Sequence, residues 1–265
     1  MVDNPKCTFT RTRSPSLLLL VLLIALTVAV SPRLARSSGR CGPCLRLDTR
    51  SENFDNVTPP ALPQGWLAIN ALGPPPLWGT SNNGVPTPPA DTSPNAAFID
   101  DSAELSDKRL DSTSFSFFEA CCVQLTFRHN FNLEASDIDP SVVFDGGVLE
   151  ISTDGGNTFH DILAAGGTFT EGGYNRTIRT DRGSPIAGRQ AWSGNSGGFI
   201  TTTVTVPSAS PFTNFRWRMA TDNSGSEEGW RVDTVMISWC QGPPCTPKPL
   251  PTPRHRPTPA PRPSP

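Results

Sequence analysis

Short apolar segments that alternate with polar residues, separated by glycine-rich turns, restrict the fold of this chain most. Between residues 51 and 241 long helical periodicity is missing. Phe215, Trp217 and Met219 lie on one face of such a segment, and Gly155 and Gly156 mark a tight turn. Alternation of this kind predicts strands with one face in a core. Roughly eight to ten such strands favour an all-β fold, a two-sheet antiparallel β-sandwich of the jelly-roll type.

The segments that we expect to form strands include 122–131, 147–152, 158–162, 199–206, 215–220 and 229–237. Residues 59–95 contain many prolines and few periodic signals, so long loops are expected there. The formal net charge of −2 gives no global basic field, which argues against a nucleic-acid partner.

Both ends of the chain differ in composition from this block. A basic stretch precedes an apolar run from Leu17 to Val30, which is shorter than the about 20 apolar residues of a spanning helix. A signal peptide is therefore expected, with an uncleaved hydrophobic helix that anchors the chain as the alternative. The protein would be secreted or tethered, with membrane contact only through this segment. The expected order is signal or anchor 1–31, linker 32–50, folded domain 51–241 and disordered proline-rich tail 242–265.

Six cysteines follow the apolar run: Cys41, Cys44, Cys121, Cys122, Cys240 and Cys245. An even number in an exported chain favours disulfides. Zinc is the weaker alternative, because Cys41 and Cys44 form a C-x-x-C pair but no second such pair is present. Redox chemistry is weaker still, since no βαβ pattern surrounds that pair.

The order of motifs resembles the MAM domain family, including its bacterial relatives attached to secreted peptidases and adhesins. The likeness runs over Glu52-Asn53-Phe54-Asp55, Trp78-Gly79-Thr80, Asp91-Thr92-Ser93, Ala103-Glu104-Leu105-Ser106, the segments 122–127 and 147–151, and Gly229-Trp230-Arg231-Val232-Asp233 with Cys240. The resemblance implies a jelly-roll sandwich used for adhesion or for recognition of protein or glycan surfaces. It also implies a late disulfide between Cys122 and Cys240. Cys121 and Cys245 could then form an adjacent bridge, and exchange between Cys121 and Cys122 stays open because neighbouring strand residues face opposite ways.

A structural calcium ion is the expected cofactor. The first and last strands of a jelly roll commonly lie close together, so Glu52 or Asp55 is expected near Asp233. The resemblance adds Asp91, Asp100 and Asp101 from the intervening loops. Calcium takes six to eight oxygen ligands, which such a set supplies. The alternative is that Asp233 accepts backbone hydrogen bonds at a strand end.

No catalytic constellation is predicted. The string Gly194-Asn195-Ser196-Gly197-Gly198 resembles the nucleophile loop of trypsin-like serine proteases. Neither His129 nor His160 has the sequence context of that family's base, so a turn is expected instead. The adjacent acids Glu227-Glu228 and Asp100-Asp101 are most simply solvated loop charges.

Tryptophans outside the strands are the expected ligand contacts: Trp66, Trp78 and Trp192. Trp217 and Trp230 are expected in the core. The sequence thus favours a non-catalytic extracellular adhesion or recognition module whose ligand is a protein or a glycan. The alternatives are a jelly-roll hydrolase, either a glycosidase or a peptidase with a carboxylate-based site, and a structural cell-envelope protein.

Overall fold

The computed structural model describes residues 44, 46–117, 120–206 and 210–241. The chain divides into two compact units, and the described fold belongs to the unit of residues 41–244. The expected signal or anchor segment and the expected tail lie outside the described residues. Within the described residues, no helix has the length and apolar character that a membrane crossing requires.

The described part of the chain contains fourteen strands. They are β1 (Arg46–Glu52), β2 (Leu67–Leu72), β3 (Gly79–Ser81), β4 (Ala96–Ile99), β5 (Ser106–Asp111), β6 (Ala120–Asn132), β7 (Gly146–Ser152), β8 (His160–Asp161), β9 (Thr168–Glu171), β10 (Arg176–Thr177), β11 (Gln190–Ala191), β12 (Ile200–Val206), β13 (Asn214–Thr221) and β14 (Gly229–Gln241). The segment 59–95, expected to be loops, therefore contains the short strands β2 and β3 as well.

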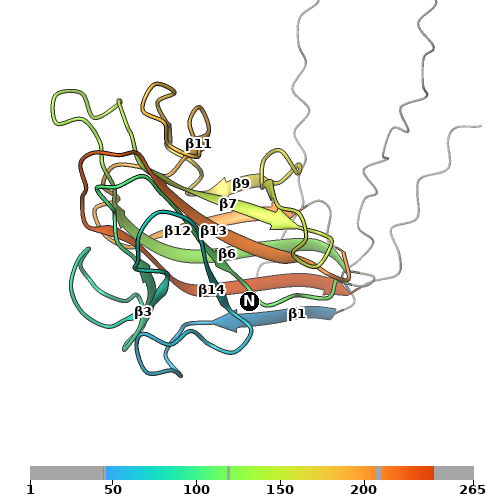
Figure 1. Ribbon diagram of the computed structural model, residues 1–265. Coiled ribbons are helices and arrows are strands. Elements are labelled where there is room, and N and C mark those ends of the chain that lie inside the picture. Colours follow the sequence, from blue (N-terminus) through green and yellow to red (C-terminus); the bar gives the residue numbers. More distant parts are fainter. Residues whose placement is uncertain (1–43, 45, 118–119, 207–209, 242–265) are drawn as a thin grey trace, which may run out of the picture. The chain divides into compact units, whose positions relative to one another are not determined.

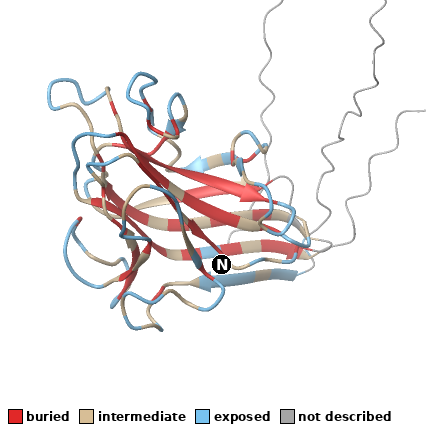
Figure 2. Cartoon of the chain, in the orientation of Figure 1, coloured by how far each residue is buried: buried red, intermediate tan, exposed pale blue. Residues whose placement is uncertain are grey.

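Two antiparallel sheets form a sandwich, which confirms the predicted all-β architecture (Figure 1). The seven-stranded sheet has the order β3-β4-β14-β6-β12-β9, with β1 paired to β14 as well. The five-stranded sheet has the order β2-β5-β13-β7-β8, and β10 and β11 form a separate hairpin. Buried residues concentrate on the strands of both sheets, whereas most of β1 is exposed (Figure 2).

Aromatic rings from both sheets fill the core between them. Phe127 of β6 meets Trp217 of β13 edge-on, with ring centroids 5.5 Å apart. Trp230 of β14 is fully buried, as predicted, and so is Trp217. Gly147 of β7 lies against the Trp230 indole, and a Cβ there would come within 2.5 Å of the ring. A strand glycine at such a close approach gives a bulky neighbour its space.

A bulge divides β14 into two halves that pair with different strands. Asp233 lies opposite Arg128 of β6, but the next pairs shift, with Met236 opposite Thr126. Thr234 within the bulge has a φ of 46°, a left-handed conformation that is uncommon outside glycine. The first half of β14 pairs with β4 and the second half with β1. The bulge also lets both Val232 and Val235 face the core.

Strand β1 corrects the predicted start of the domain. Arg46–Glu52 pairs with β14 over its whole length, so residues 46–50 of the expected linker belong to the sandwich. The same pairing brings Cys44 to Cys240, and the two form a disulfide. This bridge excludes the expected Cys122–Cys240 bond, because Cys240 is already bonded to a residue beside the edge strand. Cys245, the expected partner of Cys121, lies outside the described residues.

Arg231 holds the proline-rich segment 83–89 against the seven-stranded sheet. Its guanidinium donates to the carbonyl oxygens of Asn83, Val85, Pro86 and Pro89, at 2.7 to 3.0 Å. The Arg231 side chain is fully buried and also stacks over the Phe98 ring, 4.5 Å from its centroid. A segment with few apolar anchors is therefore fixed by one residue of the central strand.

Candidate functional site

A polar cleft of about 510 Å³ lies where β6 ends and the loops of both sheets meet. This end of the sandwich is opposite the Cys44–Cys240 disulfide, since β6 and β14 run antiparallel along their full lengths. The residues that line the cleft are Asn132, Leu133, Ala135, Ser136, Asp137, Pro140, Asn175, Arg176, Ser193, Gly194, Asn195 and Glu227.

Hydrogen bonds between separate loops fix the walls of the cleft. Arg176 Nε donates to the carbonyl oxygen of Pro140 at 3.3 Å, which joins the β6–β7 loop to β10. Asn175 Nδ2 donates to Ser193 O and Asn175 Oδ1 accepts from Ser193 N, both at 3.0 Å. The Leu133 amide donates to Gly194 O at 3.0 Å. The backbone around the cleft is therefore pre-organised by contacts that do not need a ligand.

The chemistry of the cleft is that of amide, carboxylate and guanidinium groups. Asn132 Nδ2 donates a hydrogen bond to Glu227 Oε2 at 3.1 Å, and this bond orients both side chains. Asn195, Arg176 and Asp137 are exposed and direct further polar groups to solvent. None of the described residues that line the cleft has an aromatic side chain. Such a surface can donate and accept several hydrogen bonds at once.

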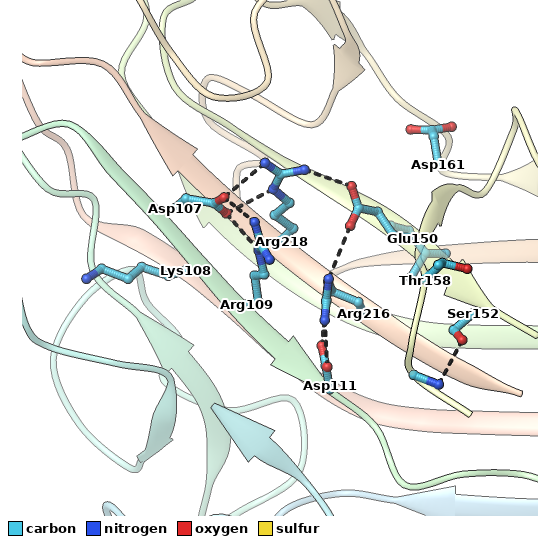
Figure 3. Close-up of polar contacts among 12 residues, drawn as sticks. Asp107, Lys108, Arg109, Asp111, Glu150, Ser152, Thr158, Asp161, Arg216 and Arg218 are labelled. Atoms are coloured by element: carbon cyan, nitrogen blue, oxygen red, sulfur yellow. Dashed lines mark hydrogen bonds and ion pairs between the residues drawn. The ribbon is translucent and has the colours of Figure 1, made fainter. Parts of the chain in front are cut away.

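A network of arginines and carboxylates covers part of the outer face of the five-stranded sheet (Figure 3). It consists of Asp107, Arg109, Asp111, Glu150, Asp161, Arg189, Arg216 and Arg218. Arg218 joins Asp107 to Glu150, with contacts of 2.9 and 3.1 Å, and Arg216 binds Asp111 through two nitrogens at 2.6 and 2.8 Å. Each charge has a partner of opposite sign within the network, and Arg189 joins it from the segment before β11, so the charges on this face are paired and the cleft is the better candidate site.

The tryptophans expected to bind a ligand are instead part of the core. Trp66 is 8% exposed, Trp78 3% and Trp192 0%. Trp192 lies between Phe127, Tyr174 and Trp230, because the segment between β9 and β12 folds back over the sandwich. The expectation that these rings form a ligand surface is therefore wrong. Their positions outside regular strands concealed how deeply their loops are packed.

The expected calcium ligands are not among the acids whose oxygens meet within 4.8 Å in the described part of the chain, although Asp55 lies near enough to Asp233 to raise its pKa, as expected. Asp233 Oδ2 accepts hydrogen bonds from the Asp91 and Thr92 amides at 2.8 and 2.9 Å, and its Oδ1 accepts from the Thr234 amide at 2.6 Å. This matches the alternative of a carboxylate that holds backbone at a strand end. Burial raises the pKa of Asp233 to about 6.

The side chains of the other five predicted ligands are engaged in other contacts, and Asp101 Oδ2 accepts from the amides of Glu134 and Glu227. Asp91 pairs with Arg128, and the Asp55 carboxylate accepts from Asn95 N and from Asn53 Nδ2. Glu52 Oε1 accepts from the Phe54 amide, and burial raises the pKa of Asp100. The acidic residues whose oxygens meet within the described residues are Glu134, Asp145 and Asp222. None of the six predicted ligands is one of these three, but Asp101 adjoins them through the amide of Glu134.

Ser196 has a structural role in the turn after β11. Its Oγ accepts a hydrogen bond from the Phe131 amide at 2.9 Å and donates one to Asn130 Oδ1 at 3.1 Å. His129 is fully buried and bonds to Thr202 and Trp230. Serine and histidine thus serve separate contacts. Asp101 is likewise structural rather than solvated, because its Oδ2 accepts from the amides of Glu134 and Glu227.

Sequence reasoning missed the cleft. Its side chains come from four loops, and each is an ordinary polar loop residue when viewed alone. One signal was available: Asn132, Asn175 and Asn195 each follow or precede a strand at the same end of the sandwich. Antiparallel pairing of β6 with β14 and β12 brings those strand ends together.

Neither a protein-family model nor a curated protein sequence matches the chain. Among solved structures, it is similar to the K3 cleaved adhesin domain of Lys-gingipain from Porphyromonas gingivalis, with 17% identity, 73% of this chain and 99% of that chain covered, and a TM-score of 0.44. The K1 domain of the same protein is 16% identical, with 72% of this chain and 97% of that chain covered and a TM-score of 0.41. The CBM22-1 xylan-binding domain of Xyn10C from Paenibacillus barcinonensis is 12% identical, with 74% of this chain and 97% of that chain covered and a TM-score of 0.39. Similarity at this level assigns no function to this chain, and the MAM resemblance stays an expectation.

Proposed function

We propose that this domain is a non-catalytic extracellular recognition module that binds a carbohydrate in the polar cleft. The observation that supports the proposal is the lining itself. Asn132, Asn175, Asn195, Arg176 and Glu227 surround a space of about 510 Å³. Sugars present vicinal hydroxyl groups that both donate and accept, and amide and carboxylate side chains complement them.

A protein ligand fits this surface less well. Protein interfaces draw most of their affinity from a desolvated centre of aromatic, methionine or arginine side chains. The described residues of the cleft include no aromatic ring, and its apolar members are Leu133, Ala135 and Pro140. Without a ring on which a sugar could stack, we expect modest affinity, with a Kd nearer 1 mM than 1 μM.

A hydrolytic role is less well supported by the positions of the acids. A glycosidase needs two carboxylic groups that flank the scissile bond and reach the substrate. The acids that converge, Glu134, Asp145 and Asp222, do so inside the protein, where Asp145 is 0% and Asp222 1% exposed. An extracellular location accords with the Cys44–Cys240 disulfide, since such bonds persist in oxidising compartments.

The test is a glycan array probed with the full chain, followed by calorimetric titration of the best oligosaccharide. Arg176→Ala and Glu227→Ala should each weaken binding about tenfold, because each removes a charged hydrogen-bonding group from the cleft. Arg46→Ala and Glu171→Ala are the matched controls, since both side chains are exposed on strands outside the cleft lining. Both controls should bind like the unaltered protein.

Two results would count against the proposal. The first is an array on which no glycan retains the full chain, even where the glycan is present at millimolar concentration. The second is a bound oligosaccharide whose affinity is the same in both cleft variants and in both controls. That second result would mean that the oligosaccharide binds on another surface. The arginine–carboxylate network on β5, β13 and β7 would be tested next.

A further inference from the structure

A group of buried carboxylates lies at the same end of the sandwich as the cleft, at strand ends of both sheets. Asp145 directly precedes β7, Asp222 directly follows β13, and Glu134 lies in the β6–β7 loop. Oxygen atoms of these three side chains all lie within 4.8 Å of one another. Asp101, from the loop after β4, adjoins the group, because its Oδ2 accepts a hydrogen bond from the Glu134 amide at 2.8 Å.

Glu134 Oε2 and Asp222 Oδ2 are buried oxygens without a hydrogen-bond partner among the described residues. Asp101 Oδ1 and Asp145 Oδ2 are likewise buried and accept from no N–H or hydroxyl group there, although the two carboxyl groups interact with each other. Asp145 is 0%, Asp222 1% and Asp101 5% exposed. Buried polar atoms in native proteins are almost always paired, and an unpaired charged one is especially costly. One proton shared between Asp101 and Asp145 would satisfy that pair but not Glu134 or Asp222, so the group as a whole indicates a ligand that carries positive charge.

The oxygens that do have partners show how the group is held. Asp145 Oδ1 accepts from the Asp222 amide at 2.6 Å, and Asp222 Oδ1 accepts from the Ser224 amide at 2.7 Å. Backbone donors therefore fix one oxygen of Asp101, of Asp145 and of Asp222. Gly225 passes against Glu134, where a Cβ would come within 2.0 Å of Oε1, so the β13–β14 loop closes over the group.

The protein supplies little positive charge of its own here. No lysine or arginine forms an ion pair with any of the four acids within the described residues. Arg182 is near enough to lower the pKa of Glu134 somewhat. Burial and the neighbouring acids outweigh it: they raise the pKa of Glu134 to about 7 and also raise the pKa of Asp145.

We propose that Glu134, Asp145 and Asp222, with Asp101 beside them, bind a structural calcium ion. The ligand set is entirely oxygen, which hard divalent cations prefer. Calcium–oxygen distances are about 2.4 Å, so two oxygens on opposite sides of the ion are about 4.8 Å apart. Magnesium requires shorter contacts and a near-ideal octahedron, which acids drawn from separate loops satisfy less readily.

The ion would connect loops that otherwise meet only through single hydrogen bonds. Glu134 lies between Leu133 and Ala135, which line the cleft, and Asp101 Oδ2 accepts from the amide of Glu227, another lining residue. The ion site stands on the buried acids alone and does not depend on the cleft's binding a carbohydrate.

The test is calorimetric titration of CaCl2 into the full chain after removal of divalent ions with a chelator. We expect binding of one ion, with a weaker response to MgCl2. Asp145→Asn and Asp222→Asn should abolish the binding heat. Both amides can still accept the backbone hydrogen bonds through Oδ1, so the fold should persist, and Glu134→Gln at the half-buried rim provides a third variant.

Asp233→Asn is the buried control, because Asp233 is a fully buried aspartate outside the group. Both of its oxygens accept from backbone amides, so the amide variant should be less stable while it keeps the acids of the proposed site. It should bind calcium like the unaltered protein. The proposal is overturned if the unaltered protein gives no calcium heat, or if Asp145→Asn and Glu134→Gln both bind like the unaltered protein. It is also overturned if Asp233→Asn loses the binding while Asp145→Asn keeps it. Loss of carbohydrate binding alone has no bearing on it.

Discussion

His129 anchors a chain of hydrogen bonds across the core. The indole Nε1 of Trp230 can only donate, so His129 Nδ1 accepts its hydrogen at 3.2 Å. The ring hydrogen therefore lies on Nε2, which donates to Thr202 Oγ1 at 2.8 Å. Thr202 Oγ1 donates in turn to the carbonyl of Gly172 at 2.6 Å. This arrangement requires a neutral imidazole, and burial accordingly lowers the pKa of His129 to about 3.

The buried histidine predicts a pH dependence of stability. Because its folded pKa lies below the usual value of about 6.5, the unfolded chain takes up a proton first as pH falls. The stability that His129 contributes is complete above about pH 6.5 and is lost as pH falls toward 3. The difference in unfolding free energy between the unaltered protein and His129→Gln should therefore shrink by about 2 kcal/mol between pH 6.5 and pH 5.

Urea denaturation at each pH measures this difference. His160→Gln is the matched control, because His160 is exposed on β8. Its difference from the unaltered protein should stay constant over the same range. A difference for His129→Gln that does not change with pH would show that the ring is already charged, or able to become so, in the folded protein.

Single residues also show where sequence reasoning reached its limit. Trp217 and Trp230 were predicted in the core because alternation placed them on the apolar face of a strand. Trp192 lies between Ala191 and Ser193 near a glycine-rich turn, where alternation gives no signal. Its burial depends on the packing of Phe127 and Tyr174 around it, and those residues are far away in the sequence. Burial of a loop residue is decided by tertiary contacts that local pattern does not contain.

The start of β1 is the clearest correction among the strands. The expected closeness of the first and last strands is confirmed by the pairing of β1 with β14, but β1 begins at Arg46, inside the expected linker. The sequence of β1, Arg46–Glu52, alternates weakly and most of it is exposed. An edge strand needs only a template to pair with, and the second half of β14 supplies one through the register from Leu47 opposite Cys240 to Glu52 opposite Val235. The strong alternation of β6 and β14 was sufficient to predict central strands. The shift at Thr234, which frees an edge for β1, was not visible.

The Cys44–Cys240 bond is expected to hold β1 in place. The bridge joins residues 196 positions apart, and a loop of that length gives about 5 kcal/mol in the chain-entropy account of disulfides. The double variant Cys44→Ser/Cys240→Ser should lower the unfolding free energy by several kcal/mol. It should also speed amide exchange at Thr49 and Arg50 of β1 far more than at Trp217 and Met219 of β13.

Hydrogen exchange followed residue by residue measures the second effect. Both cysteines are replaced so that neither position keeps a thiol that has lost its partner. Unchanged exchange in β1 would mean that backbone pairing with β14 suffices to hold the strand and that the disulfide has no structural role at this edge.

Across the whole molecule, the loop end brings together what the sequence keeps apart. Asp101, Glu134, Asp145 and Asp222 come from three separate loops, and each is an acid within two residues of a strand end. The predicted ion set combined the first and last strands with Asp91, Asp100 and Asp101 from the loops, and of these only Asp101 lies beside the carboxylate group. Hydrogen bonds from backbone amides satisfy Asp233. The sandwich could be predicted because alternation is local. The carboxylate group could not, because it depends on which strand ends meet.

A bound ion at this group should stabilise the whole fold by mass action. Glu134 belongs to a loop from the seven-stranded sheet, whereas Asp145 and Asp222 adjoin strands of the five-stranded sheet, so the ion would join the two sheets. At a free CaCl2 concentration of about 100 times Kd, the gain is about 2.7 kcal/mol. For a domain of this size the melting temperature should rise by roughly 5–10 °C relative to protein in chelator. Thermal melting of the full chain measures the shift, which should vanish in Asp145→Asn and persist in Asp233→Asn and Arg176→Ala. Because no sugar is present, the result is independent of the cleft ligand. An equal shift in Asp145→Asn and in the unaltered protein would place the stabilising ion elsewhere.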